Sequence, residues 1–481
     1  MSSGNKVLSN LAWRFAERIG AQGVKLLVEL VLARLLLPDD YGVVAIVTVL
    51  ISIFNVFVDS GFANALIQKL DADDLDFSSV FWFNILWCIV LYAFLFFIAP
   101  FIALFYGNSD LIAIIRVLGV QILISGVKNV EQAYVSRKLL FRKFFFATIG
   151  GTIGAAVLGV FMALHGYGVW ALVAQHLFNT LLDTIILWIT VKWRPKFIFS
   201  LPRLKSLFSY GWKLLVSALI DTVYNQFSQL LIGKVYTSGD LAYYNRGNQF
   251  PCLFITNINS SIDSVLLPTL SKEQRDKQRV KELTRRSIQT SVFVIAPLMI
   301  GLIVVGEPFV RLILTEKWLP CVFYMRIFCI AYIFYPIHTA NLNAIKALGR
   351  SDIYLKLEVI KKIFGLTIII STMFISLDAL TYSTLLVSVI SQIINSWPNK
   401  KLLSYGYFEQ LKDICPSILL SCVMGAVVYM ITLFHMNDLI TLVLQIIFGI
   451  VIYVAFSKFL HLEIYEFVSG KAKSIYHSLK R

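Results

Sequence analysis

The stretch NLAWRFAERIGAQGVKLLVELVLARLL, residues 10–36, determines how the rest of the chain can be organised. It is long and apolar enough to cross a bilayer as a helix, since about 20 mostly apolar residues span the hydrocarbon core. Its residues 14–29 nevertheless include six that are polar or charged: Arg14, Glu17, Arg18, Gln22, Lys25 and Glu29. At about 100° per residue, all of these except Glu17 fall within one stripe roughly 80° wide.

This charged stripe cannot face lipid. A lysine, arginine or aspartate at the centre of a membrane helix costs about 2.5 to 3.5 kcal/mol, and each neighbouring leucine returns only about 0.5 kcal/mol. The stripe therefore predicts a face turned to a bundle interior or a wet cavity. The alternative is that the groups satisfy one another, with Lys25 and Glu29 as an i,i+4 pair and Arg14 at the membrane interface.

The composition is that of a polytopic membrane protein. Of 481 residues, 58% are hydrophobic and 15% charged, whereas soluble domains have about 45–50% and 25%. The six cysteines form no C-x-x-C pair, so neither a disulfide framework nor a zinc site is predicted, and no metal or other cofactor is expected. Motifs for nucleotide hydrolysis, zinc proteases and serine hydrolases are absent, so the chain is not expected to be an enzyme.

Apolar runs of spanning length predict an all-α fold of about fourteen transmembrane helices. They lie near 10–36, 42–66, 79–104, 111–135, 144–164, 168–191, 208–235, 242–268, 288–306, 319–345, 354–376, 380–397, 414–434 and 438–457. The longest connections, 192–207 and 269–287, are both basic, and no stretch between the segments could hold a folded soluble domain.

The chain has 43 lysines and arginines against 28 acidic residues. We interpret this basic surplus as a signal of how the chain is oriented in the membrane. Lysine and arginine gather in alternate loops, and on the opposite side only the loop 307–318 contains any. The positive-inside rule then predicts an even number of helices with both termini cytoplasmic. Because the surplus is spread over one membrane face, it does not indicate nucleic-acid binding.

The chain also repeats itself at an offset of about 200–208 residues. Leu37 to Tyr41 corresponds to Thr237 to Leu241, Val58-Asp59-Ser60 to Ile262-Asp263-Ser264, Pro100 to Pro308 and Arg142 to Arg350. An even number of helices per copy predicts parallel repeats about an axis along the membrane normal. The predicted organisation is a six-helix bundle at 1–197, a second at 198–408, and two further helices with a cytoplasmic tail at 409–481.

Polar stripes recur on the first helices of both halves and are predicted to line a cleft. The residues assigned there are Asn55 and Asp59 on the second helix, Lys213, Asp221 and Asn225 on the seventh, and Arg246, Gln249 and Asn257 on the eighth. The alternative for such groups is simple helix-to-helix hydrogen bonding. Late in the fourth helix, Lys128 and Glu131 are predicted to form an ion pair at its cytoplasmic end.

Three motifs resemble those of a known family. Leu32-Ala33-Arg34 with Leu35 to Pro38 and Asp39-Asp40-Tyr41-Gly42 resembles the opening of Wzx-type polysaccharide flippases, nearest the WzxC-like branch. Asp59-Ser60-Gly61-Phe62 followed by Ala65 to Gln68 resembles the end of their second helix. Thr315-Glu316-Lys317-Trp318 is similar to their G-E-K-W motif, with threonine in place of glycine.

This resemblance implies the fold of the multidrug/oligosaccharidyl-lipid/polysaccharide exporter superfamily, with two six-helix bundles in a V and two extra helices. It implies a multi-pass protein of the bacterial inner membrane that flips undecaprenyl-pyrophosphate-linked oligosaccharides for capsule, exopolysaccharide or O-antigen. Implied partners are this lipid-linked substrate, membrane lipids and a polysaccharide polymerase or export machinery. A lipid II flippase and a MATE-type drug/cation antiporter are the alternatives in the same fold.

The hypothesis assigns roles to the polar residues. Arg14, Arg18, Lys25, Lys213 and Arg246 are candidates for contact with the anionic pyrophosphate. Glu17, Glu29 and Asp221 are candidates for proton or cation coupling, by analogy with ion-driven exporters. The sequence names neither the sugars nor the coupling ion.

Overall fold

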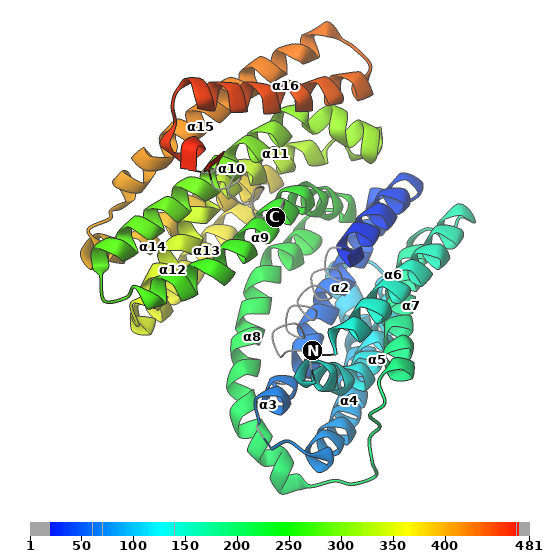
Figure 1. Cartoon of the computed structure of the whole chain (residues 1–481). Coiled ribbons are helices and arrows are strands. Elements are labelled where there is room, and N and C mark those ends of the chain that lie inside the picture. Colours follow the sequence, from blue (N-terminus) through cyan, green and yellow to red (C-terminus); the bar gives the residue numbers. More distant parts are fainter. Residues whose placement is uncertain (1–19, 60, 70, 139, 468, 471–481) are drawn as a thin grey trace, which may run out of the picture. The chain divides into compact units, whose positions relative to one another are not determined.

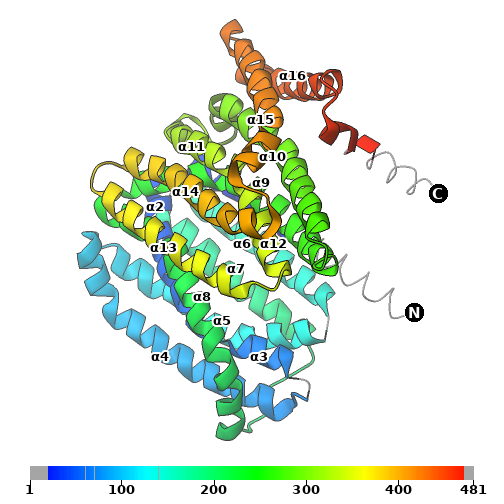
Figure 2. The same ribbon diagram turned by 90° about the vertical axis from the view of Figure 1, so that its left-hand side faces the viewer.

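The computed structural model describes residues 20–59, 61–69, 71–138, 140–467 and 469–470. The described chain is helical almost throughout (Figures 1 and 2). It divides into two compact units, one ending at Ala242 and the other beginning at Tyr243.

The first unit holds the helices up to the start of α9. Residues 20–35 are helical, followed by α2 (Pro38–Asp59), α3 (Phe62–Gln68), α4 (Asp74–Tyr106), α5 (Leu111–Arg137), α6 (Phe141–Leu164), α7 (Val169–Thr190) and α8 (Leu201–Val235). Helix α4 packs against α5 and α6 against α7, while α2 packs against both α5 and α8.

Helix α9 (Ser238–Lys272) begins in the first unit and continues into the second. The second unit then contains α10 (Lys277–Ile313), the 3-10 turn η1 (Glu316–Trp318), α11 (Cys321–Ile333), α12 (Tyr335–Ala347), α13 (Ser351–Met373), α14 (Leu377–Leu403), α15 (Tyr407–Met430), η2 (Ile431–Phe434) and α16 (Asp438–Phe459). Figure 2 shows α13 beside α14, with which it packs.

The chain is a polytopic all-α membrane protein. Within the described residues, eleven helical segments are long and apolar enough to cross a membrane. The predicted segments 208–235 and 354–376 lie in α8 and α13, which are helical but too polar to be among the eleven. The predicted segment 10–36 is helical from residue 20, and its earlier part lies outside the described residues.

Several predicted segment ends differ from the observed helix bounds. The predicted segment 319–345 matches one candidate span, Cys321–Ala347, which a one-residue turn at Phe334 divides into α11 and α12. Pro336, which has no backbone N–H to donate, lies in the first turn of α12. The basic connection 269–287 shortens to 273–276, because α10 begins at Lys277. The Asp276 side chain caps α10 by accepting a hydrogen bond from the Arg279 backbone N–H at 3.0 Å.

A buried carboxylate anchors the end of the first unit that is predicted to face the cytoplasm. Asp76, with no exposed surface, pairs with Lys69 Nζ at 2.7 Å and with Arg203 Nη1 of α8 at 3.2 Å. The Asp73 side chain accepts a hydrogen bond from the Asp76 backbone N–H at 3.0 Å, which lowers the pKa of the Asp73 carboxyl below its ordinary value. These contacts fix the start of α8 against α4.

The backbones of α2 and the α8–α9 segment touch near both ends of α2. An added Cβ at Gly42 would lie 1.8 Å from the Ser238 carbonyl oxygen, and one at Gly61 would lie 2.2 Å from the Gly211 carbonyl oxygen. Gly61 also has a φ of 69°, a conformation that glycine adopts at no steric cost. Glycine at these positions therefore permits the close approach of the two segments.

Matching contacts occur in the two halves of the chain. The Leu37 backbone N–H donates to Asp40 Oδ2 at 3.0 Å, and the Thr237 backbone N–H donates to Asp240 Oδ2 at 3.1 Å. Arg116 Nε of α5 donates to the Phe96 carbonyl oxygen, and Arg326 Nε of α11 donates to the Ile303 carbonyl oxygen. An internal repeat with parallel copies predicts such matched contacts.

Candidate functional site

The first group of predicted site residues falls on the segment that opens the chain. Arg14, Glu17 and Arg18 lie outside the described residues. Lys25 Nζ lies 3.7 Å from Glu29 Oε1, and the two side chains are 65% and 20% exposed. Both interact electrostatically with His176 of α7. The structure thus brings Lys25 and Glu29 together and places them beside a titratable group that the sequence analysis did not include.

The predicted residues of α8 lie on one row of the helix. Lys213, Asp221 and Asn225 are spaced by multiples of four residues, and all three are exposed. These three side chains are therefore not part of a packed core, and apolar side chains of the same stretch, such as Trp212 and Ile220, are exposed as well.

In the second unit the structure brings Arg246 and Gln249 together. The Arg246 Nη1 donates to Gln249 Oε1 at 2.5 Å, and its guanidinium carbon lies 5.0 Å from the ring centroid of Trp318. Arg246 is only 5% exposed, so its charge is held by hydrogen bonding and by the indole face. Asn257, by contrast, is exposed and donates to the Leu253 carbonyl oxygen of its own helix at 2.8 Å.

The structure reveals a charged cluster that the sequence analysis did not predict. Lys128 Nζ of α5 lies 2.9 Å from Asp183 Oδ2 of α7, and Asp59 at the end of α2 interacts electrostatically with the same lysine. The predicted pair between Lys128 and Glu131 was wrong, since Glu131 instead lies 3.5 Å from Arg194. The available signal was Asp183 itself, the single charged residue in the predicted segment 168–191.

The interior of the second unit contains a hydrogen-bonded polar network. Asn341 of α12 donates to Gln410 Oε1 of α15 at 2.8 Å and to Ser396 Oγ of α14 at 3.1 Å. Asn399 in turn donates to the Asn341 carbonyl oxygen at 3.2 Å. All four side chains are fully buried. The network ties α15, the first of the two extra helices predicted from sequence, into the second unit.

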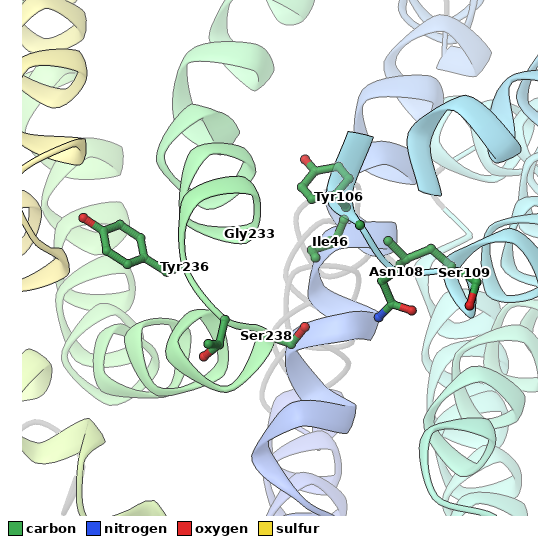
Figure 3. Close-up of a pocket in the computed structure, with 10 residues that line it drawn as sticks. Ile46, Tyr106, Asn108, Ser109, Gly233, Tyr236 and Ser238 are labelled. Atoms are coloured by element: carbon green, nitrogen blue, oxygen red, sulfur yellow. The ribbon is translucent and has the colours of Figure 1, made fainter. Parts of the chain in front are cut away.

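A polar pocket of about 340 Å³ lies in the first unit, at the end predicted to face the outside. Figure 3 shows Tyr106 and Asn108 at the end of α4, Ile46 on α2, and Gly233 and Ser238 around the α8–α9 turn. Ser109, Tyr236 and Thr237 add three hydroxyl groups. The lining contains no charged side chain, so the pocket suits an uncharged polar group such as a sugar ring better than a phosphate.

Within the described residues, two compact helical units with eleven candidate membrane spans are the architecture of a polytopic membrane protein. The chain belongs to the polysaccharide biosynthesis protein family, whose model matches residues 31–323. It is 25% identical over 388 residues to the teichuronic acid biosynthesis protein TuaB of Bacillus subtilis, covering 79% of both chains. It is 22% identical over 420 residues to the lipopolysaccharide biosynthesis protein WzxC of Escherichia coli, covering 87% of this chain and 83% of that relative.

The fold is that of a known flippase. The structure of the lipid II flippase MurJ in an inward closed conformation matches with a TM-score of 0.76, covering 94% of this chain and 99% of that one. At 16% identity this likeness shows the fold alone. The chain is therefore a membrane protein of a polysaccharide biosynthesis family, and its fold is shared with that flippase.

Proposed function

We propose that this protein flips undecaprenyl-pyrophosphate-linked oligosaccharide units across the bacterial inner membrane, for assembly of capsule, exopolysaccharide or O-antigen. The observation that carries the proposal is the family match over residues 31–323. The relatives TuaB and WzxC, each matched over most of its length, are named for the biosynthesis of surface polysaccharides. A polysaccharide polymerase or export machinery would receive the flipped unit.

The physical chemistry of the chain suits such a cargo. The lipid-linked unit needs cationic side chains for its pyrophosphate and uncharged hydrogen-bonding groups for its sugars. Arg14, Arg18, Lys25, Lys213 and Arg246 remain the proposed anion contacts, and Glu17, Glu29 and Asp221 the proposed coupling residues. Asn55, Asp59, Asn225, Gln249 and Asn257 remain proposed lining residues. Transport would alternate the access of these groups between the two membrane faces.

A lipid II flippase is the second candidate, because MurJ shares the fold over 94% of this chain. Its substrate is also an anionic polyprenyl lipid, so the cationic residues do not separate the two. A drug/cation antiporter of the MATE type is less suited, because the proposed contact residues would repel a cationic drug.

Complementation tests the proposal. We expect the gene to restore surface polysaccharide in a strain that lacks its own polysaccharide flippase but keeps its glycosyltransferases and polymerase. We expect no rescue of growth in a strain depleted of its lipid II flippase. Rescue of growth alone would reassign the cargo.

The anion-contact role is tested in the same complemented strain. Lys25→Glu should abolish the restored polysaccharide, whereas Lys25→Arg and the exposed control Lys401→Glu should retain it. Equal amounts of each variant in the membrane fraction are required for the comparison. Full activity of Lys25→Glu would refute the assignment.

A further inference from the structure

The polar pocket of the first unit has walls that are joined to each other by side-chain contacts. Tyr106, at the end of α4, donates its hydroxyl hydrogen to the Leu230 carbonyl oxygen of α8 at 3.3 Å. Lys234 of α8 donates to the Phe105 carbonyl oxygen of α4, and its Nζ lies 4.5 Å from the centroid of the Phe105 ring. A pocket with fixed walls binds a ligand at a lower entropic cost than a pocket with mobile walls.

Close packing of backbone bounds the pocket on the α2 side. Gly233 of α8 and Ile46 of α2 both line it, and an added Cβ at Gly233 would lie 2.9 Å from Ile46 Cγ1. Ser238, at the start of α9, lies against Gly42 of α2, where an added Cβ would be 1.8 Å from the Ser238 carbonyl oxygen. A ligand in this pocket is therefore surrounded by α2, the α4–α5 turn and the α8–α9 turn (Figure 3).

Three hydrogen-bonding groups of the pocket have no partner among the described residues. Asn108 Oδ1 accepts from the Asp110 backbone N–H at 3.0 Å, which leaves the two Nδ2 hydrogens of Asn108 available. In Figure 3 this nitrogen lies on the side of Asn108 that faces Ser238. The hydroxyls of Ser109 and Ser238 are also without a hydrogen bond to the described part of the chain. One amide donor and two hydroxyls, which both donate and accept, are thus open to a ligand.

These groups suit a sugar ring better than an ion. The ten lining residues include no charged side chain, whereas phosphate sites use arginine, lysine or several backbone N–H groups. A sugar ring offers hydroxyls that donate and accept, and C–H faces that pack on an aromatic ring such as that of Tyr106. The volume of about 340 Å³ is at the lower end of the range for small-molecule sites, about 300–1,000 Å³. The pocket therefore suits one sugar residue rather than a long glycan.

The corresponding turn of the second unit is filled by a side chain. At an offset of 208 residues, Gly107 corresponds to Thr315 and Asp110 to Trp318. Gly107 and Thr315 both have a positive φ, 70° and 88°, so the two turns share this backbone feature. Trp318, however, is fully buried, and its large side chain takes the position that Asp110 has in the first unit. The fold therefore does not require an open polar space at this turn.

We propose that this pocket binds one uncharged sugar residue of the flipped glycan at the outer face of the membrane. The inference rests on the proposed function, because flipping brings a lipid-linked glycan to this face. Asn108 Nδ2 and the hydroxyls of Ser109 and Ser238 hydrogen-bond the sugar hydroxyls, while Tyr106 packs on a face of the ring. Binding on this side lowers the rate at which the flipped unit moves back, so the site favours net export.

Sugar binding is tested on the purified full-length protein, without a lipid-linked substrate. The probes are the methyl glycosides of glucose, galactose and N-acetylglucosamine, observed by saturation-transfer difference NMR. At least one of them should bind, and glucose 1-phosphate should bind no more tightly than methyl glucoside. Binding of none of the three would overturn the proposal. Tighter binding of the phosphate would overturn the ligand class, because an anion would then be the preferred ligand.

Asn108→Asp tests where the sugar binds. The change keeps an acceptor for the Asp110 N–H but removes the Nδ2 donor, so the dissociation constant should rise by about fivefold, the effect of one lost hydrogen bond. The matched control is Asn437→Asp, because Asn437 Oδ1 accepts from the Leu439 backbone N–H, also at 3.0 Å, at an exposed turn of the second unit. This control should bind the probe as the wild type does. Equal binding by the wild type and Asn108→Asp would refute the assigned site.

The complemented strain separates this inference from the proposed function. At equal amounts of protein in the membrane fraction, Asn108→Asp should give several-fold less surface polysaccharide than Asn437→Asp. Undiminished polysaccharide in an Asn108→Asp variant that has lost sugar binding would overturn the role of the pocket in export. A wild type that binds the sugar probe but fails complementation would count against the proposed function and not against the pocket.

Discussion

Thr315 holds a backbone conformation that suits glycine rather than a β-branched residue. Its φ is 88° and its ψ is 169°, a region that costs about 1–3 kcal/mol for residues other than glycine. The conformation places the Thr315 carbonyl oxygen where the Trp318 N–H donates to it at 3.2 Å. The G-E-K-W motif that residues 315–318 resemble has glycine at this position. This chain therefore adopts a backbone conformation that suits glycine with a threonine in its place.

Replacing this residue should therefore stabilise the protein. We expect Thr315→Gly to raise the midpoint of thermal unfolding in detergent by a few degrees, equivalent to about 1 kcal/mol after the larger chain entropy of glycine is subtracted. Thr315→Ala keeps a Cβ and should bring little or no gain. A lower midpoint for Thr315→Gly would show that the threonine side chain stabilises the turn by more than its backbone costs.

Individual contacts were the hardest feature to predict from sequence. The Lys25–Glu29 pair follows from i,i+4 spacing on one helix and is observed. The same local reasoning failed for Lys128, whose partner Asp183 is 55 residues away on another helix. Spacing along a helix identifies neighbours only on that helix. Contacts between helices depend on how the helices pack, which the apolar pattern of a membrane helix does not specify.

At the scale of the helices, close packing of α2 against the α8–α9 segment depends on Gly42. An alanine Cβ there would overlap the Ser238 backbone, with its carbonyl oxygen at 1.8 Å and its carbonyl carbon at 2.4 Å. Backbone cannot rotate aside as a long side chain does, so the segments must separate. We expect Gly42→Ala to destabilise the protein by about 1–3 kcal/mol, seen as a lower midpoint of thermal unfolding.

The matched control for Gly42→Ala is Gly301→Ala. Gly301 lies within α10, and nothing would lie within 4 Å of an added Cβ. Alanine is the better helix former, so this change should leave the midpoint unchanged or raise it slightly. Equal effects of the two substitutions would contradict a role for close packing at Gly42.

The presence of each helix was predicted more accurately than the residues at which it begins and ends. The apolar runs placed a helix at every predicted segment that the structure describes, because length and apolarity are what a spanning helix requires. The early start of α10 at Lys277 was missed, since its first turns are basic and polar, and its start is marked instead by the Asp276 cap. The break at Phe334 was also missed, although Pro336 was present to signal it.

At the scale of the whole molecule, the sequence pattern predicts the internal repeat and the membrane topology. It does not predict how the charged residues of different helices pair. Matched contacts such as Leu37 with Asp40 and Thr237 with Asp240 follow the offset of the repeat. The Asp59, Lys128 and Asp183 cluster interrupts that symmetry, since its counterpart pair is His338 with Asn395. The pairing of Lys128 with Asp183 depends on the packing of α5 against α7, which the sequence pattern does not specify.

The predicted orientation in the membrane depends on the uneven distribution of lysine and arginine between the loops of the two sides, to which there is one exception. Loops predicted to be outside contain no lysine or arginine except between 307 and 318. The structure accounts for Arg311 of this exception, because its Nη1 lies 3.3 Å from Asp438 Oδ1 and its Nε lies 3.9 Å from Glu316 Oε1. The positive charge of Arg311 is thus balanced by carboxylates on the same side of the membrane. A balanced arginine is easier to reconcile with an outside location than an isolated arginine would be.

Labelling of single cysteines tests this orientation. Asp110→Cys, between α4 and α5, should react with a membrane-impermeant maleimide in cells whose outer barrier has been opened. Arg275→Cys, between α9 and α10, should react only after the inner membrane is broken. Both native residues are exposed, and the parent protein carries serine in place of its exposed cysteines, Cys415 and Cys422. Its remaining cysteines provide the background signal. Labelling in the reverse order would place both termini outside, and the basic loops would then face the side from which the positive-inside rule excludes them.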